Sequence, residues 1–416
     1  MADLLYLVHR MPYPPNKGDK VRSYHLLKHL AERHRVHLGT FVDDPDDWQH
    51  LDALRAICAD VCALPLHPKR RRIASLAALA GQDALTLRYY HDARLHDWVA
   101  RTAARVPLAA SVVFSSSMGP YAERVPGLPM LMDLVDVDSA KWAAYGDTHR
   151  GPLAWLYRRE GRQLLAYERT VAARAQRSFL VTDKEVALFR GLAPEVADRV
   201  EVSCNGVDAD QFAPATGRKS PYAADELPVV FTGAMDYWPN VDAVCWFAEA
   251  MLPALRQRWP KARFWIVGRA PTPAVKALAG EAVTVTGTVD DVRPYLQHAA
   301  VVVAPLRLAR GVQNKVLEAM AMARPVVAAR TCVEAIDVLP GRDLLDAETP
   351  EDYLQQVDAL LANPARGLQI GAAARRCVLA HYSWPARLAG IDAALDRLST
   401  APVRPNTTPQ TAAAPA

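Results

Sequence analysis

Short apolar runs alternate with amphipathic segments along almost the whole chain. The segments between the runs repeat their apolar positions at the three- and four-residue spacing of a helix. This alternation is typical of parallel β-sheets covered by helices, so the predicted fold class is α/β. The runs form two series. The first predicts strands at Leu4–Val8, Val36–Phe41, Val61–Leu64, Ser111–Phe114, Pro129–Met132, Ser178–Val181 and Val200–Ser203, and the second at Val229–Thr232, Phe264–Val267, Val283–Val285, Val301–Ala304 and Val326–Ala328.

The boundary between the two series carries turn signals. An Asn205-Gly206 pair is followed by a polar stretch at 216–221 that Pro and Gly interrupt. With 416 residues, two domains of roughly 200 residues each are expected. We therefore predict domains at residues 1–205 and 206–384, a last helix at 385–399, and a disordered Pro/Thr/Ala tail at 400–416.

The composition excludes several classes of protein. A net charge of +4 does not argue for nucleic acid, and the six cysteines lack metal-site spacing, so neither a metal nor another cofactor is expected. The N-terminus does not resemble a signal peptide, and no apolar window is long enough to span a bilayer. We expect a cytoplasmic protein. The basic run Lys69–Arg72 with the apolar Ile73–Ala80 indicates either peripheral contact with an anionic membrane or a solvated loop.

The segment from Val301 to Pro325 suits a phosphate ligand. An apolar run enters a loop at Gly311, which permits a tight turn, and a helix is predicted from Val312 to Ala323. The start of such a helix offers unpaired N–H groups to an anion. Lys315 and Glu318 lie on one face of this helix, so the cation can meet a phosphate while the carboxylate accepts from a diol such as ribose.

The first strand leads into a Pro-rich loop that ends at Gly18 and Asp19. Ligands of open α/β sheets bind where loops leave the carboxyl ends of strands, and His9 begins this loop. The alternative is a simple connection capped by Asp19. A helix is predicted at Lys20–Glu32 with its apolar positions inward. The GxGxxG pattern of a dinucleotide site is missing here.

A literal DxD pattern occurs in Asp133-Leu-Val-Asp136-Val-Asp138, which is predicted to follow a strand. Alternation puts Asp136 and Asp138 on one face. This pair can bind a cation, orient an acceptor hydroxyl or cap a helix, and all three remain open. Farther along, the charges of the predicted helix Pro152–Arg174 indicate a solvated face.

Four motifs together resemble glycosyltransferase family 4, the retaining GT-B enzymes, over nearly the whole chain. They are the Pro-rich loop with Gly18, the segment Asn205-Gly-Val-Asp208 followed by Phe212, the strand end Ile266-Val-Gly268, and Lys315-Val-Leu-Glu318-Ala-Met-Ala. Within that family, three motifs resemble sugar transferases associated with PEP-CTERM exopolysaccharide loci: Asp136-Val-Asp138-Ser139-Ala-Lys-Trp142, Asp236-Tyr-Trp-Pro-Asn-Val-Asp242 and Gly311-Val-Gln-Asn-Lys315.

The resemblance implies two Rossmann-like domains facing a central cleft, with the acceptor bound by the first, which the last helix rejoins, and the nucleotide sugar by the second. It implies transfer of a sugar, without a metal, to a saccharide or polyprenyl-diphosphate-linked acceptor in exopolysaccharide synthesis. The expected catalytic residues are Asp19, Asp136 and Asp138. The expected donor-binding residues are Gly18, Gly233, Arg269, Arg310, Gly311, Val312, Asn314, Lys315 and Glu318.

Two positions depart from the family pattern. Where the family commonly has the first glutamate of a Glu-x7-Glu pair, this chain has Arg310, which cannot accept hydrogen bonds from a sugar. The segment after Gly233 lacks the Arg and Lys that many relatives have there, so Arg269, Arg310 and Lys315 are expected to bind the diphosphate. Two other functions remain open: a nucleotide-sugar epimerase of the same architecture, and a non-catalytic subunit that binds a nucleotide sugar.

Overall fold

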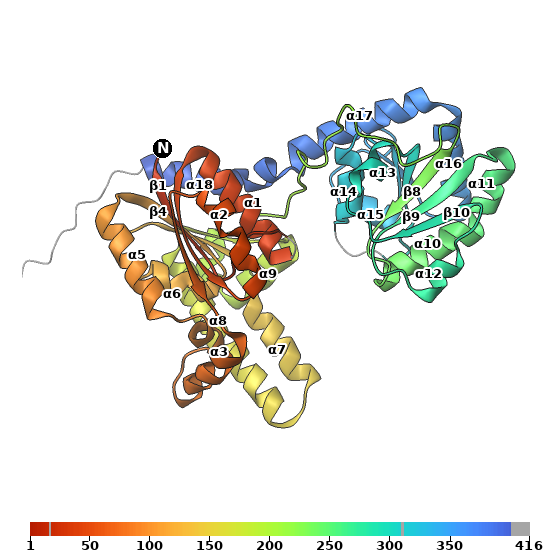
Figure 1. Cartoon of the computed structure of the whole chain (residues 1–416). Coiled ribbons are helices and arrows are strands. Elements are labelled where there is room, and N and C mark those ends of the chain that lie inside the picture. The colour runs from red at the N-terminus through yellow and green to blue at the C-terminus, as the bar shows by residue number, and fades with distance from the viewer. Residues whose placement is uncertain (16–17, 309–311, 401–416) are drawn as a thin grey trace, which may run out of the picture. The chain divides into compact units, whose positions relative to one another are not determined.

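A computed structural model describes residues 1–15, 18–308 and 312–400, which divide into two compact units. Unit 1 comprises Met1–Cys204 and the chain from Leu388 onward, and unit 2 comprises Asn205–Arg387. In each unit helices cover a parallel β-sheet (Figure 1). The sequence placed the junction one residue farther along, between 205 and 206. Residues 401–416 of the predicted tail lie outside the described residues.

Unit 1 is built on a seven-stranded sheet whose neighbouring strands are all parallel, in the order β3-β2-β1-β4-β5-β6-β7. The central β1 is almost completely buried, because apolar side chains on both of its faces pack under helices. The strands are β1 Asp3–Val8, β2 Arg35–Val42, β3 Asp60–Pro65, β4 Leu108–Phe114, β5 Met130–Val135, β6 Arg177–Leu180 and β7 Val200–Val202.

The unit 1 helices connect these strands and cover the sheet. The two longest are α1 and α8, and short 3-10 turns lie at Pro45–His50, Leu76–Ala80, Ser116–Met118 and Pro194–Arg199. The helices are α1 Gly18–Arg33, α2 Leu51–Arg55, α3 Pro68–Ser75, α4 Leu85–Tyr89, α5 Ala93–Arg105, α6 Gly119–Ala122, α7 Asp138–Thr148, α8 Gly151–Arg174 and α9 Asp183–Leu192.

The buried face of α1 differs from the predicted one. Lys20 and Arg22 are each 1% exposed, whereas Val21 and Tyr24, expected to point inward, keep partial exposure. The Lys20 ammonium donates to Asp47 (Nζ–Oδ2 2.5 Å), a carboxylate that is also buried. The helical pattern located α1, and Leu27 and Leu30 of its apolar positions are buried as predicted. It did not predict the burial of Lys20 and Arg22, because a buried cation requires a partner distant in sequence.

Unit 2 contains a six-stranded sheet, also parallel throughout, in the order β10-β9-β8-β11-β12-β13. Its edge strand β13 was not predicted, because it has three residues and a polar residue at its centre, Asp346. The strands are β8 Leu227–Thr232, β9 Ala262–Val267, β10 Val283–Gly287, β11 Val301–Ala304, β12 Val326–Ala329 and β13 Leu345–Ala347.

The helices of unit 2 enclose a large apolar core that the valines of β8, β11 and β12 dominate. The helix predicted at Val312–Ala323 is shorter at both ends. The helices are α10 Trp238–Ala250, α11 Leu252–Arg258, α12 Pro273–Ala277, α13 Arg293–Gln297, α14 Asn314–Ala321, α15 Arg330–Val333, α16 Pro350–Ala362 and α17 Pro364–His381.

The last helix, α18 (Trp384–Thr400), begins in unit 2 and belongs to unit 1 from Leu388 onward. Asp392 on this helix contacts two side chains of α1, the imidazole of His29 (2.9 Å to Nε2) and the guanidinium of Arg33 (3.1 Å to Nη1). These contacts hold the end of the chain against the first α-helix. Across the described ranges, every helix is too short or too polar to cross a bilayer.

Candidate functional site

Two glycines in unit 2 bring the carboxyl ends of β8 and β9 into direct backbone contact. The Gly233 N–H donates to the Val267 carbonyl (3.0 Å), and a Cβ added to Gly268 would overlap the Gly233 carbonyl oxygen. A side chain at Gly268 is therefore excluded by space. Gly233, predicted to bind the donor, lies at the carboxyl edge of the sheet, where ligands of such folds bind.

Lys315 extends from α14 to this glycine crossing. Its ammonium donates to the Asn240 amide oxygen and lies 4.7 Å from the centre of the Phe231 ring, and a Cβ on Gly233 would come within 3.4 Å of it. Burial lowers the pKa of Lys315 to about 8, yet most of the side chain is still charged at neutral pH. A charged ammonium at the carboxyl edge of the sheet is suited to an anionic ligand.

Asn240 was not among the predicted site residues. It is 4% exposed in the first turn of α10, where its amide N–H donates to the Ala234 carbonyl (2.8 Å) while its oxygen accepts from Lys315. It thus fixes both the loop after Gly233 and the ammonium. The signal available in the sequence was a polar residue within the apolar face that Ala243 and Val244 continue.

Glu318 follows Lys315 by one helical turn, as predicted. Burial raises the pKa of its carboxyl to about 7, and the nearby Lys315 charge opposes that rise only in part. The group is therefore near its titration midpoint at neutral pH. A hydrogen-bonding hydroxyl pair such as a ribose diol would stabilise its ionised form.

The other predicted donor residues do not all gather at this point. The Arg269 side chain is 68% exposed and lies 4.0 Å from Asp236, while Val312 and Asn314 are exposed just before and at the start of α14. Gly18 belongs to unit 1, at the start of α1. Arg310 and Gly311 lie outside the described residues.

Unit 1 contains a cavity of about 830 Å³ that brings together the three predicted catalytic residues, Asp19, Asp136 and Asp138. One part of its wall is polar and the other is aliphatic and aromatic. The polar part also includes Arg72 and Lys141. The apolar part consists mainly of Leu76, Leu85, Tyr89, Tyr90, Phe114, Trp142, Tyr145, Leu153, Leu156 and Tyr157.

Asp19 is ionised within a cluster of basic groups. It accepts from Arg10 (Nη1–Oδ2 2.7 Å) and lies 3.7 Å from His9 Nε2. Burial alone would raise its pKa, but His9 and Arg10 hold the pKa well below the ordinary value of an aspartate. His9 itself packs parallel to the Phe114 ring with centroids 5.8 Å apart, so it has a structural partner as well as a place in the cavity wall.

Asp136 and Asp138 share a single cation, the ammonium of Lys141. Its distances to the two carboxylates are 2.8 Å and 3.1 Å, which agrees with the expectation that they lie on one face. Within the described ranges, no group of three or more His, Cys, Asp or Glu side chains is placed to hold a metal ion. The cation next to this DxD pair is thus a lysine of the protein.

Asp133, the first acid of that motif, does not follow the strand as predicted but lies within β5. It is 1% exposed, and its Oδ2 accepts from the Arg22 Nε at 2.8 Å. A buried carboxylate with a bidentate guanidinium partner has no access to the cavity, so Asp133 is structural.

The cavity wall includes two non-glycine residues with left-handed backbone. Ser115 (φ 73°) directly follows β4 and Val135 (φ 70°) is the last residue of β5, and both line the cavity. For a β-branched residue this conformation is a strained outlier, and such residues persist where the surroundings hold them in place. The strain thus coincides with the polar wall that carries Asp136.

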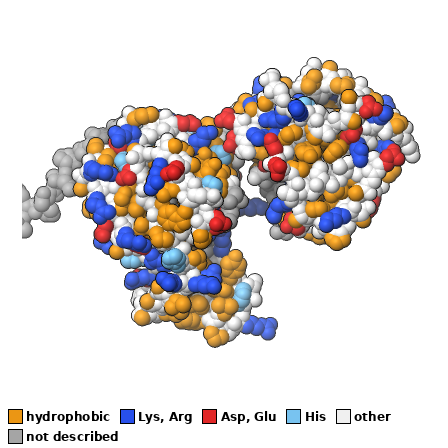
Figure 2. Space-filling model, in the orientation of Figure 1, with side chains coloured by type: hydrophobic (Ala, Val, Ile, Leu, Met, Phe, Trp, Pro, Cys, Tyr) orange, Lys and Arg blue, Asp and Glu red, His pale blue; other side chains and the backbone are white. Residues whose placement is uncertain are grey.

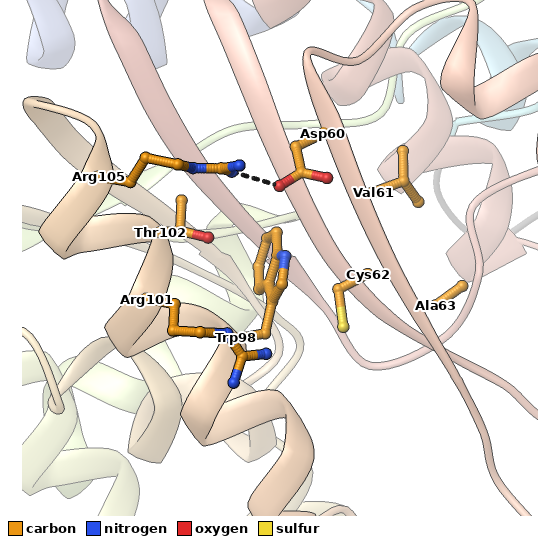
Figure 3. Close-up of a pocket in the computed structure, with 8 residues that line it drawn as sticks. All are labelled: Asp60, Val61, Cys62, Ala63, Trp98, Arg101, Thr102 and Arg105. Carbon is orange, nitrogen blue, oxygen red and sulfur yellow. Dashed lines mark hydrogen bonds and ion pairs between the residues drawn. The ribbon is translucent and has the colours of Figure 1, made fainter.

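A second cavity, of about 480 Å³, lies at the edge of the unit 1 sheet between β3 and α5 (Figure 3). An ion pair between Arg105 and Asp60 (2.7 Å) lies beside it, and the Trp98 ring and the Cys62 thiol line it. Burial raises the pKa of Cys62 to about 11, so the thiol stays protonated at neutral pH. The predicted site residues are not among those lining this cavity.

The comparisons with known proteins agree with this architecture. Residues 226–363 match the family model described as glycosyl transferases group 1. Two solved structures are similar to nearly the whole chain. Sucrose-phosphate synthase from Thermosynechococcus elongatus has 16% identity and a TM-score of 0.59, and the match covers 96% of this chain and 99% of that one. Anabaena HepE in complex with UDP has 16% identity and a TM-score of 0.60, and the match covers 95% of this chain and 100% of that one. The fold is GT-B.

A third GT-B structure is WaaG, a glycosyltransferase involved in lipopolysaccharide biosynthesis, with 16% identity and a TM-score of 0.55 over 96% of this chain and 100% of that one. HepE has also been solved with UDP-glucose. Comparison with curated proteins gives no significant match. The family match covers β8 to α16, and therefore includes Gly233, Asn240, Lys315 and Glu318.

Proposed function

We propose that the protein is a glycosyltransferase that moves a sugar from a nucleoside diphosphate-sugar to a hydroxyl of an acceptor. The observation that carries the proposal is the Lys315–Asn240 pair above the Gly233–Gly268 crossing, within the segment that matches group 1 glycosyl transferases. The binding of UDP and UDP-glucose by HepE, which has the same fold, supports a nucleotide-sugar donor.

In this proposal unit 2 binds the donor. Lys315 contacts the diphosphate, because its ammonium lies beside Gly233 at the glycine crossing and packs over the ring of Phe231. Glu318 accepts hydrogen bonds from a diol of the donor. Arg269 and Arg310 add charge toward the phosphates, and the amides that follow Gly311 are available to phosphate oxygens.

Unit 1 binds the acceptor in the cavity that Asp19, Asp136 and Asp138 line. These carboxylates orient the attacking hydroxyl. Lys141 pairs with Asp136 and Asp138, and Arg10 pairs with Asp19. We propose retention at the anomeric carbon, with the leaving diphosphate accepting the acceptor proton on the same face of the sugar. In that mechanism the protein contributes orientation and charge stabilisation, and needs no metal.

The apolar part of the cavity favours an acceptor with a lipid. Three of its lining residues, Leu76, Tyr145 and Leu153, also belong to a group of exposed hydrophobic side chains at the end of unit 1 where α3 and α7 lie (Figure 2). The group, which we call the apolar tip, consists of Ile73, Leu76, Leu79, Tyr145, Leu153 and Trp155.

The apolar tip lies next to the basic run Lys69–Arg72 on α3, a combination that matches an anionic bilayer. We therefore propose peripheral contact with the cytoplasmic face of the inner membrane and a polyprenyl-diphosphate-linked acceptor of exopolysaccharide synthesis. The likeness of three motifs to PEP-CTERM-associated transferases supports this assignment.

A transfer assay tests the proposed reaction. Purified protein is incubated with UDP-, GDP- and dTDP-sugars, first alone and then with polyprenyl-diphosphate-linked saccharides. We expect a sugar to appear on the acceptor only when both substrates are present. Interconversion of a donor sugar without acceptor would identify an epimerase instead, and donor binding without turnover on any acceptor would identify a binding subunit.

Vesicle flotation tests the membrane contact. The protein is expected to float with phosphatidylglycerol-containing vesicles and not with phosphatidylcholine alone. The double variant Ile73→Asp with Trp155→Asp should stay at the bottom of the gradient, whereas Leu368→Asp, at an exposed leucine of unit 2, should float like the wild type. Equal flotation of both variants would contradict the role of the apolar tip.

A further inference from the structure

The turn between β5 and α7 carries the two cavity carboxylates, and its backbone is held by two glutamates from other helices. The Val137 N–H donates to Glu185 Oε2 at 2.7 Å. The Ser139 N–H donates to Glu168 Oε1 at 3.2 Å, and the Ser139 hydroxyl is 2.5 Å from Glu168 Oε2. The N–H groups on either side of Asp138 are therefore both held by carboxyl groups.

Neither glutamate belongs to the cavity wall. Glu168 is 1% exposed within α8, and Glu185 lies in the first turn of α9. Both contact the turn rather than the cavity, Glu185 through one backbone N–H and Glu168 through a backbone N–H and the Ser139 hydroxyl. Burial raises the pKa of Glu168 to about 8, so its carboxyl group is largely protonated at pH 7. It therefore contacts Ser139 mainly as a neutral acid.

The turn needs such support for two reasons. It follows directly on Val135, whose left-handed backbone is unfavourable for a β-branched residue. It also starts the helix on which Lys141 bridges Asp136 and Asp138, so a shift of the turn would move all three charged groups together. Close packing by Gly161 of α8, where a Cβ would lie 3.0 Å from the Ser139 carbonyl oxygen, leaves little room for such a shift.

We infer that Glu168 is a positioning residue for the acceptor, supported by Glu185: it fixes the turn that presents Asp136, Asp138 and Lys141 to the cavity. The inference rests on the proposed function for its link to an acceptor. The claim that Glu168 and Glu185 restrain the turn does not depend on the proposed function. An experiment can therefore test the two halves separately.

Three variants separate positioning from folding. Glu168→Gln keeps an acceptor for the Ser139 N–H and resembles the neutral acid, Glu168→Ala removes both contacts, and Arg169→Gln changes the next residue, which is exposed and paired with Glu195. For Glu168→Ala we expect kcat/KM for the acceptor to fall about 10- to 100-fold, because small misplacements of orienting groups have effects of this size. The donor KM should stay unchanged. Glu168→Gln should recover to within about threefold of the wild type, and Arg169→Gln should match it.

Amide hydrogen exchange provides the readout that does not require transfer. In Glu168→Ala, residues 137–141 should exchange at least tenfold faster than in the wild type, while α8 residues distant from the turn keep their protection. Unchanged exchange at 137–141 would refute the restraint, whatever the activity. Faster exchange with unchanged acceptor kcat/KM would refute the positioning role. Absence of transfer by the wild type would count against the proposed function. The amide exchange rates would still show whether Glu168 restrains the turn.

Discussion

Replacing Lys315 by alanine gives the most direct test of the donor site. The substitution removes the ammonium that donates to Asn240 and lies over Phe231, and leaves the helix α14 intact because alanine favours helix. Hydrogen bonds to charged groups contribute about 1.5 to 3 kcal/mol each. The dissociation constant of a nucleoside diphosphate should therefore rise roughly 10- to 150-fold.

The pKa of Lys315 adds a second, independent expectation. Because burial lowers that pKa to about 8, the free protein loses the charge as the pH rises above 8, whereas a bound diphosphate keeps it. Affinity should then fall roughly fifteenfold between pH 8 and pH 9.5 in the wild type. Glu318, with a pKa of about 7, is already ionised over most of this range. Lys315→Ala should show no such dependence.

Isothermal titration calorimetry with UDP, GDP and dTDP at both pH values measures these effects. Lys261→Ala is the matched control, since Lys261 is an exposed lysine of the same unit that pairs with Asp225 and precedes β9, at the opposite edge of the sheet. The control should bind like the wild type. Equal affinity of Lys315→Ala and Lys261→Ala for every nucleotide would remove Lys315 from the donor site.

Three further outcomes are expected. Asn240→Ala should weaken nucleoside diphosphate binding about fivefold, the loss of roughly one neutral hydrogen bond, and calorimetry would contradict this role if affinity were unchanged. Gly268→Ala should lower the thermal unfolding midpoint by several degrees, because a Cβ would overlap the Gly233 carbonyl oxygen; a wild-type midpoint would disprove the close crossing. Arg22→Met should cost about 3 to 5 kcal/mol in urea unfolding by leaving Asp133 buried and unpaired. The double variant with Asp133→Leu should recover much of that loss, and failure to do so would show that the two residues act independently.

The sequence predicted the strands well, because the length of each apolar run and the helical period of the segments between the runs are enough to recognise the strands of a parallel sheet. All twelve predicted strands occur, since each is a compact apolar run, and the central strands of a parallel sheet bury such runs on both faces. It failed at β13, where a strand of three residues around Asp346 has no detectable period. Helix ends also differed by a few residues, as for α14.

Charged residues that pair over long distances could not be assigned from the sequence. The charges of α8 were expected to face solvent, but Arg159 donates to the Ala78 carbonyl (2.7 Å) and Glu160 accepts from the Leu85 N–H (2.6 Å). These partners are separated by 75 and more positions. A pattern confined to one helix assigns such residues to its polar face, because nothing local distinguishes a solvated charge from a paired one.

The candidate site was predictable to the extent that it depends on local motifs. Lys315 and Glu318 lie one helical turn apart on α14, as their spacing indicated, the Lys315 ammonium lies beside Gly233, and Asp19, Asp136 and Asp138 line one cavity. The sequence did not assign the residues that hold them. Asn240 lay inside a motif quoted for the family resemblance, but an amide has no spacing rule that would reveal its partner.

The distribution of buried charge indicates different demands on the two units. Among the described residues, Asp343 is the one Lys, Arg, Asp or Glu of unit 2 that is fully buried, whereas unit 1 has eight; Lys315 and Glu318 of unit 2 are only partly buried. Buried ion pairs rarely add net stability, so a core of this size gains little from them. Several of those in unit 1 hold elements that line the cavity: Glu160 holds the start of α4, Glu168 holds the start of α7, and Arg22 holds β5 through Asp133. The apolar part of the cavity wall offers an acceptor few directional contacts, so these come mainly from the polar part. The orientation of the acceptor then depends on a rigid cavity wall. Buried hydrogen-bonded charges make the wall more rigid than apolar packing alone would.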